Sequence, residues 1–245
     1  MLAAPVSGGV EGENVASERY IKMLIVSEAW KTAYPGAAAG ILVMRNVSNP
    51  AQHPALDRCR SELESQLRAR FGNPADLKAL EPIQAYTAYF KRFKKTYPVL
   101  LQLESVIFKG QSIPRVAALV EAMFIAELKN VLLTAGHDLE AIQMPVRLDV
   151  SSGGEQYTRL NGQEQMLKPG DMMMADAQGV VSSVIYGPDY RTRIKPDTRH
   201  VFFAVYAPPG VGEQAVYQHL QDIQANVMLV APEAAVERLN VFGTG

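Results

Sequence analysis

The sequence predicts a mixed α/β protein in which helices pack on β-sheets. Helical spacing of apolar residues dominates the first half of the chain, whereas short strands and turn signals dominate residues 146–206. Of the 245 residues, 48% are hydrophobic and 20% are charged, which suits a domain large enough to bury its own core. We expect residues 1–19, rich in Gly, Ser and Glu, to form a mobile start and residues 20–245 to form a single domain.

The first half of the chain alternates strand and helix signals. Aliphatic runs on either side of the turn signal Tyr34-Pro35-Gly36 predict strands at residues 21–26 and 39–47. Residues 54–71 predict a helix, because Pro54 suits its first turn and a glycine follows its last residue.

Two more helices are predicted before the pattern changes, at residues 86–97 and 114–134. The first mixes aromatic residues with Lys and Arg. The second has few polar residues and should be largely buried. Gly136 is placed to cap the end of this second helix.

The second half of the chain predicts strands, then closing helices. The Asn161-Gly162 pair lies between two short strands and is the strongest hairpin signal in the chain. The predicted strands cover residues 146–150, 156–160, 163–167, 171–176, 180–186 and 200–206. Helices are predicted at residues 211–226 and 232–240.

The motif search excludes the most recognisable enzyme classes. The sequence has no phosphate-binding Gly-rich loop, dinucleotide fingerprint, Cys-x-x-Cys, His-Glu-x-x-His or Gly-x-Ser-x-Gly pattern. The four histidines lack metal-ligand spacing, so we predict no metal and no cofactor. Cys59 is the single cysteine, and we expect it to be a small core residue. Because one cysteine cannot form an internal disulfide, a reducing, cytoplasmic location is expected for the protein. We expect no membrane span and no signal peptide.

The net charge of −1 conceals a segregation of charge. The balance of 24 Lys and Arg against 25 Asp and Glu argues against nucleic-acid binding by bulk positive charge. Residues 91–115 nevertheless carry six cations and one acid, and residues 191–199 carry four and one. Each segment is either a solvated surface or a local RNA contact, and the candidate RNA-binding residues are Lys91, Arg92, Lys94, Lys95, Arg191 and Arg193. Aromatic residues that suit base stacking lie among the first of them, at Tyr86, Tyr89, Phe90 and Phe93.

An ordered series of short motifs runs from Lys109 to Pro209. It comprises Lys109-Gly110, Leu119-Val120-Glu121, Asp138, Gly154-Glu155, Leu160-Asn161-Gly162, Ala175-Asp176, Gly187-Pro188-Asp189 and Thr198 to Val201. This order resembles the B3/B4 domain of the phenylalanyl-tRNA synthetase β subunit, and looks like that of the free-standing B3/B4 proteins. The core of the resemblance covers about residues 86–209.

The resemblance implies a layered α/β domain with an unusual β-sandwich and packed helices. In the synthetase this domain hydrolyses wrongly attached tyrosine from tRNA, and a Glu recognises the tyrosine hydroxyl. Asp189 aligns with that Glu but is one methylene shorter, and Pro188 replaces a Gly. Ala135 stands at the position of a site-lining His, and Phe124 at that of a helix Asn. The resemblance therefore implies the pocket and leaves the amino acid open.

An aminoacyl ester is already activated, so its hydrolysis needs a positioned water and donors for the developing oxyanion. Backbone donors are expected at the turn that follows a strand, and the candidate substrate-binding residues are Tyr186, Gly187 and Asp189. His137 and Asp138, expected after a helix end, are the candidate catalytic residues that order the water. An alternative interpretation gives these residues purely structural roles. His137 would then be a loop residue, Asp138 would start a turn, Tyr186 would pack in a sheet, and Asp189 would form a local turn or ion pair.

Three functions fit these observations. The first is an RNA-associated protein that binds tRNA or aminoacyl-tRNA, with hydrolysis of mischarged species in trans. The alternative is a non-enzymatic binding module for an amino-acid-like small ligand, and the third is a different small-molecule enzyme with the same pocket. A complete phenylalanine–tRNA ligase is excluded because no ATP-binding signature is present. The sequence leaves catalysis and oligomeric state open.

Overall fold

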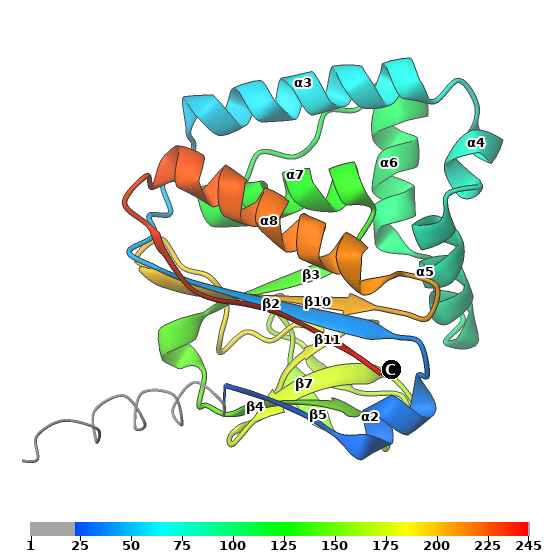
Figure 1. The fold of residues 1–245 in the computed structure, drawn as a ribbon, viewed down its shortest axis with the longest axis vertical. Coiled ribbons are helices and arrows are strands. Elements are labelled where there is room, and N and C mark those ends of the chain that lie inside the picture. Colours follow the sequence, from blue (N-terminus) through cyan, green and yellow to red (C-terminus); the bar gives the residue numbers. More distant parts are fainter. Residues whose placement is uncertain (1–22, 245) are drawn as a thin grey trace, which may run out of the picture.

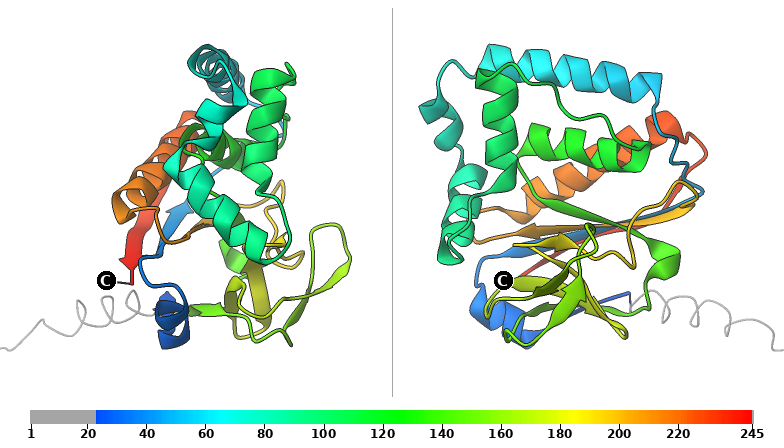
Figure 2. Two further views of the ribbon diagram at one scale, coloured as in Figure 1. Left: turned by 90° about the vertical axis from the view of Figure 1, so that its right-hand side faces the viewer. Right: turned by 180° about the vertical axis from the view of Figure 1, so that it is seen from behind.

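The computed structural model describes residues 23–244, which form three layers (Figure 1). A four-stranded sheet of order β11-β2-β10-β3 lies in the middle. Helices cover one of its faces, and a five-stranded sheet of order β1-β4-β7-β8-β9 lies against the other. The view from behind shows the same layers (Figure 2, right). This sandwich with packed helices confirms the predicted mixed α/β class; the expected mobile segment 1–19 lies outside the described residues.

The helices of the described chain are α2 (Glu28–Ala33), α3 (Pro54–Arg70), α4 (Pro74–Lys78), α5 (Glu81–Arg92), α6 (Pro98–Phe108), α7 (Ala118–Asn130) and α8 (Glu213–Val230), with the 3-10 turn η1 (Leu139–Ala141). The strands are β1 (Leu24–Val26), β2 (Ala38–Arg45), β3 (Thr134–Asp138), β4 (Val146–Val150), β5 (Gln156–Thr158), β6 (Glu164–Met166), β7 (Met172–Asp176), β8 (Gly179–Ser183), β9 (Gly187–Pro188), β10 (His200–Ala207) and β11 (Ala235–Gly243).

The two central strands of the middle sheet are buried on both faces. Strands β2 and β10 pair antiparallel along their whole length, from Ala38 opposite Ala207 to Arg45 opposite His200. Their side chains are almost all buried, which explains why the sequence shows continuous apolar runs there rather than alternation. Trp30 of α2, Leu42 of β2 and Leu56 of α3 belong to one cluster of buried apolar side chains, so the layers share a core.

Two local predictions in this part of the fold were wrong. The helix predicted at residues 232–240 is strand β11, which pairs antiparallel with β2. The free edge of β2 offers backbone partners to this segment, and such tertiary pairing overrides local propensity. Gly136 does not cap α7 but lies inside β3, because Val131 adopts a left-handed conformation (φ 61°) and ends the helix five residues earlier.

Gly40 lies where α8 packs on the middle of β2. A Cβ atom at this position would come 2.6 Å from Val216 Cγ1 and 2.8 Å from Leu220 Cδ1. We expect Gly40→Ala to lower the free energy of unfolding by about 1–3 kcal/mol through overpacking, measured by chemical denaturation. Gly72→Ala is the matched control, because no atom lies within 4 Å of the added carbon. Equal stability of the two variants would contradict close packing of α8 on β2.

Candidate functional site

A pocket of about 610 Å³ lies beside the start of β3, the edge strand of the middle sheet. Because β3 is the last strand of the middle sheet, no further strand fills the space between the helices and the second sheet. The starts of α6 and β3 and one face of α7 form one side of the pocket. The β8–β9 turn, the turn of the β5–β6 hairpin and the loop before β10 form the other.

The predicted substrate-binding residues divide between the pocket and the loop behind it. Tyr186 and Gly187 line the pocket, whereas Asp189 does not. The Asp189 side chain is buried and its Oδ1 accepts hydrogen bonds from the backbone N–H (3.1 Å) and hydroxyl of Thr192. Its Oδ2 lies 3.6 Å from the Arg191 guanidinium. The resemblance pointed to Asp189 by its place in the motif series, which carries no information about where its side chain points.

The predicted catalytic residues lie in strand β3, not after a helix end, and neither lines the pocket. His137 is fully buried, with Nδ1 2.7 Å from Thr192 Oγ1. Burial, with a further contribution from Arg191, lowers the pKa of His137 to about 3 and keeps the imidazole neutral. Asp138 accepts a hydrogen bond from Thr198 Oγ1 at 2.9 Å. Both side chains therefore brace the loop that leads into β10.

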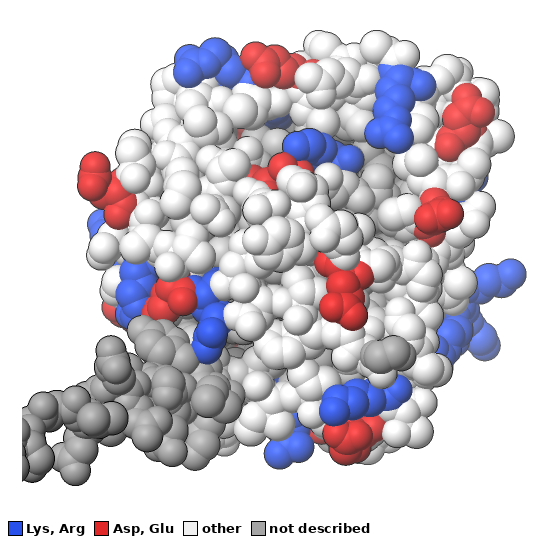
Figure 3. Space-filling view, in the orientation of Figure 1, with Lys and Arg blue, Asp and Glu red and all other residues white. Residues whose placement is uncertain are grey.

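The cations at the end of α5 are largely exposed. Lys and Arg side chains project from the body there, at the right edge of Figure 3. Lys91 and Lys94 are exposed, while the Arg92 guanidinium lies 5.2 Å from the centre of the Tyr34 ring. Lys95 Nζ lies 5.7 Å from the centre of the Tyr186 ring, which lines the pocket. Lys95 is thus the member of this segment that reaches the pocket.

The second basic segment also reaches the pocket through one residue. Arg193 lines the pocket, and its guanidinium lies 3.6 Å from the centre of the Tyr190 ring. Arg191 is instead held by Asp176, at 2.9 Å, and by the carbonyl of Ala141. The two basic segments therefore approach the pocket differently: Arg193 lines it, whereas Lys95 contacts its lining residue Tyr186. We call Lys95, Arg193 and a third cation, Arg159, the rim.

The aromatic residues interleaved with the α5 cations are not available to stack on bases. Tyr86, Tyr89, Phe90 and Phe93 are all buried, contrary to our interpretation of the sequence. They lie on the inner face of α5, where helical periodicity places them against the core. The exposed aromatic ring beside the pocket is that of Tyr190, which is 43% exposed.

Sequence reasoning missed Arg159, which lines the pocket from the turn of the β5–β6 hairpin. Within residues 23–244 its side chain has no ion-pair partner. The Asn161-Gly162 signal predicted this hairpin. A cation two residues before Asn161 was the available sign that the hairpin contributes to a site. Lys95, Arg159 and Arg193 come from three separate segments and define the rim.

Ser183 braces the pocket wall from the end of β8. It lines the pocket and donates a hydrogen bond of 2.6 Å to Asp171 Oδ2, while the Tyr89 hydroxyl donates one of 2.7 Å to Oδ1. The Tyr186 backbone N–H in turn donates to Ser183 Oγ at 3.1 Å. Burial raises the pKa of Asp171 to about 6 despite these bonds. The network fixes the turn that carries Tyr186 and Gly187.

Glu127 also lines the pocket and was not predicted as a site residue. The pocket-facing positions of α7 are Val120, Met123, Phe124 and Glu127, which follow helical spacing along one face. An acid that interrupts such an apolar stripe was the available signal. Glu127 Oε1 accepts a hydrogen bond of 2.6 Å from the Thr134 backbone N–H. Burial nevertheless raises the pKa of the carboxyl to about 8.

The raised pKa of Glu127 gives a testable dependence of stability on pH. The folded protein holds this proton more tightly than the unfolded chain does, so its contribution to stability is lost as pH rises from about 4.5 to about 8. We expect Glu127→Gln to gain stability relative to wild type by about 1 kcal/mol per pH unit across this interval. Chemical denaturation at pH 5, 6 and 7.5 measures the difference. The exposed Glu62→Gln is the control; a flat difference for both variants would contradict the shift.

A family model for the B3/4 domain matches residues 83–237. The chain belongs to the B3/4 domain family. Every residue that lines the pocket of this B3/4 domain protein, from Pro98 to Tyr206, lies within the matched segment. The resemblance inferred from the motif series is thereby confirmed.

A similar solved structure is an N-terminal fragment of the phenylalanyl-tRNA synthetase β-subunit from Pyrococcus horikoshii. The sequences are 13% identical, the TM-score is 0.43, and the comparison covers 84% of this chain and 48% of that one. This B3/4 domain protein thus spans about half the length of that fragment. No curated protein sequence matches the chain.

Two further classes of site were sought in the described part of this B3/4 domain protein. Over residues 23–244, no group of three or more His, Cys, Asp or Glu side chains is arranged to hold a metal ion. No helix within the same residues is both long and apolar enough to cross a membrane.

Proposed function

We propose that this protein binds the aminoacyl end of a tRNA. The aminoacyl group enters the pocket beside Tyr186 and Gly187, and the RNA backbone lies along the rim. One observation carries the proposal: Arg159 and Arg193, from separate segments, line a pocket with a mainly apolar wall, and Lys95 lies against the ring of its lining residue Tyr186.

The pocket wall suits an amino-acid side chain. Val120, Met123 and Phe124 present an apolar surface from α7, and the volume of about 610 Å³ is within the range of small-ligand pockets. The half-buried Tyr186 ring lies between this pocket and Lys95. A side chain of apolar character would therefore exchange water for carbon contacts on entry.

The rim suits the nucleic acid that follows the aminoacyl group. Lys and Arg side chains neutralise phosphates, and this contribution is independent of sequence. The exposed ring of Tyr190, stacked on Arg193, offers a face for an unpaired base. A single-stranded 3′ end has both features, a charged backbone and accessible bases.

Hydrolysis of mischarged aminoacyl-tRNA in trans is the reaction that we propose for this pocket. The ester is activated, so that a positioned water and hydrogen-bond donors suffice. Because His137 and Asp138 lie off the pocket, we do not assign them to this step. Ser183 lines the pocket, where its hydroxyl donates a hydrogen bond to Asp171 and so holds the wall beside the proposed ester site.

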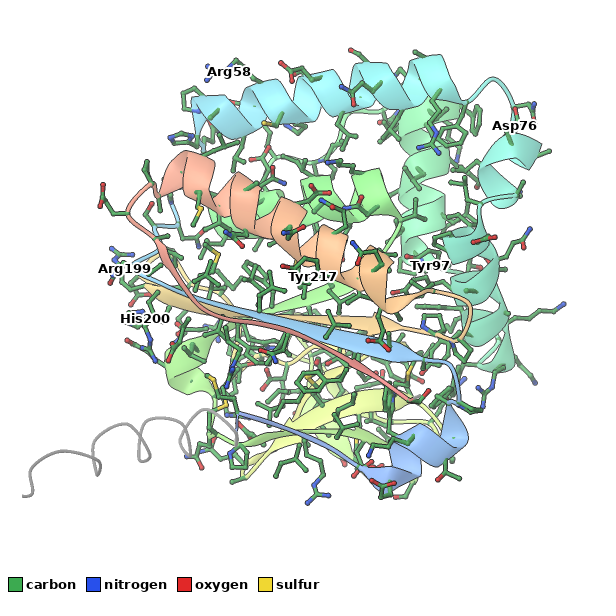
Figure 4. All side chains as sticks on the ribbon, in the orientation of Figure 1. Arg58, Asp76, Tyr97, Arg199, His200 and Tyr217 are labelled. Carbon is green, nitrogen blue, oxygen red and sulfur yellow. The ribbon has the colours of Figure 1, made fainter. Side chains whose placement is uncertain are left out.

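The experiment is incubation of the purified protein with a panel of mischarged tRNAs. We expect amino-acid release above the buffer rate for at least one tRNA that carries an apolar amino acid, and retention of that tRNA on a filter at low salt. Arg193→Ala should reduce both. Arg58→Ala is the matched control, since Arg58 lies at the outer end of α3 (Figure 4), in the layer farthest from the second sheet. Absence of both release and retention would overturn the proposal.

A second candidate function is binding of an amino-acid-like small ligand without RNA. The mainly apolar wall and the burial of His137 away from it favour a pocket that binds without catalysis. This function predicts a thermal shift with free amino-acid amides and no retention of tRNA. Retention that depends on Arg193 would exclude it.

A further inference from the structure

Glu127 is the acidic residue among the described residues that line the pocket. It lies on the α7 stripe one turn after Met123 and Phe124, and only 4% of its surface is exposed. A carboxyl group with so little access to water is costly to ionise unless a cation or several donors face it. What faces Glu127 therefore decides its role.

The protein itself provides Glu127 with few partners. The Thr134 backbone N–H donates to Oε1 at 2.6 Å, and within residues 23–244 no Lys, Arg or His forms an ion pair with the carboxyl. The nearby phenol groups donate elsewhere, Tyr86 to the carbonyl of Tyr206 at 2.6 Å and Tyr97 to that of Val131 at 3.0 Å. The pocket side of the carboxyl is thus left for a ligand.

We propose that Glu127 recognises the free ammonium group of the aminoacyl moiety in the pocket, an inference that rests on the proposed function. A primary ammonium supplies the cation and the donors that the protein does not. Aminoacyl esters carry such a group next to the carbonyl carbon. Derivatives whose amino group is acylated or absent lack the charge, so Glu127 makes the pocket selective for free aminoacyl groups over N-blocked ones.

A purely structural role for Glu127 makes a different prediction. The Thr134 contact joins the end of α7 to the start of β3, next to the left-handed Val131. Gln at position 127 keeps an oxygen that accepts from Thr134 but cannot ionise to face a cation. Glu127→Gln therefore separates recognition of a cation from bracing of the turn.

Binding of an ammonium group also predicts a proton release. The titratable groups that face Glu127 are Tyr86 from α5 and Tyr97 before α6, whose pKa values are raised by burial, and His219 of α8 contacts Thr134 with a pKa lowered to about 3. None of the three changes charge between pH 6 and 8. Glu127, with a pKa near 8, is the group that loses a proton when a cation enters.

The experiment uses the full chain and tRNAs whose 3′ end carries the acyl group through a stable amide. Phenylalanyl, tyrosyl and leucyl tRNAs are each compared with the counterpart that lacks the amino group, and with uncharged tRNA. For wild type we expect at least about tenfold tighter binding of one aminoacyl form than of its counterpart, and proton release in calorimetry at pH 7. For Glu127→Gln we expect the preference for the aminoacyl form over its counterpart to fall within about twofold and the proton release to vanish. Glu62→Gln, an exposed acid on α3, is the control.

The outcomes separate this inference from the proposed function. Equal binding of charged and uncharged tRNA by wild type would overturn both. Tighter binding of both acylated forms, with no preference for the amino group, would overturn the role of Glu127 alone. A preference that persists in folded Glu127→Gln, verified by its melting curve, would likewise assign the ammonium group to another residue.

Discussion

Replacement of Arg60 by alanine is expected to lower the free energy of unfolding by about 3–5 kcal/mol. Arg60 lies on the inner face of α3 and is only 6% exposed. Its Nε lies 2.9 Å from Glu121 Oε1 and its Nη2 lies 2.5 Å from Asp57 Oδ1. Glu121, on α7, is 1% exposed, so loss of Arg60 leaves a buried carboxylate without its cation.

The controls separate a buried charge from a lost contact. Arg60→Ala combined with Glu121→Gln should recover part of the loss, because the uncompensated charge is then absent. Lys31→Ala breaks the exposed pair with Glu28 and should change stability by less than about 1 kcal/mol. A cost below about 1 kcal/mol for Arg60→Ala, measured by urea denaturation, would show that the cluster is solvated. Because Glu121 and the pocket-lining residues share α7, the destabilised variant should also bind ligand less well.

Local sequence patterns predicted elements whose partners are close in the chain. The helix at 54–71 and the hairpin around Asn161-Gly162 were predicted within a few residues, since capping and turn residues act locally. Strand β11 was not predicted. Its partner β2 lies about 190 residues earlier in the chain, and the segment by itself fits a helix. Strand β3 was predicted as the cap and loop after a helix that ran to residue 134, since Val131, which ends the helix, is not a usual left-handed residue.

For the candidate site, the sequence indicated where residues lie along the chain but not which way their side chains point. The sequence pointed to Tyr186 and Gly187 at the end of a strand and to Arg193 in a basic segment, and all three line the pocket. It also pointed to His137 and Asp189, whose side chains face Thr192 instead. In a strand, alternate side chains face opposite sides, and a shift of one residue decides which face meets the pocket. A single sequence does not fix that register.

The basic rim should dominate the affinity for tRNA. We expect the triple variant Lys95→Ala, Arg159→Ala and Arg193→Ala to weaken binding about 100-fold at 0.1 M salt, since about 0.7 counterions are released for each single-strand phosphate contact. The slope of log affinity against log salt concentration should become shallower by about 2 for the same reason. Filter binding across a salt series, with wild type and variant side by side, measures both quantities.

The location of the cations, rather than their number, is what this variant tests. Lys31→Ala, Arg58→Ala and Lys78→Ala remove the same total charge from α2, α3 and α4, where no side chain lines the pocket. Because contacts beyond about 10 Å are screened at 0.1 M salt, this control should keep affinity within about threefold of wild type. Equal losses for the two triple variants would show that RNA is attracted by overall charge. Loss in the rim variant alone ties RNA binding to the mouth of the pocket, where the aminoacyl group must enter.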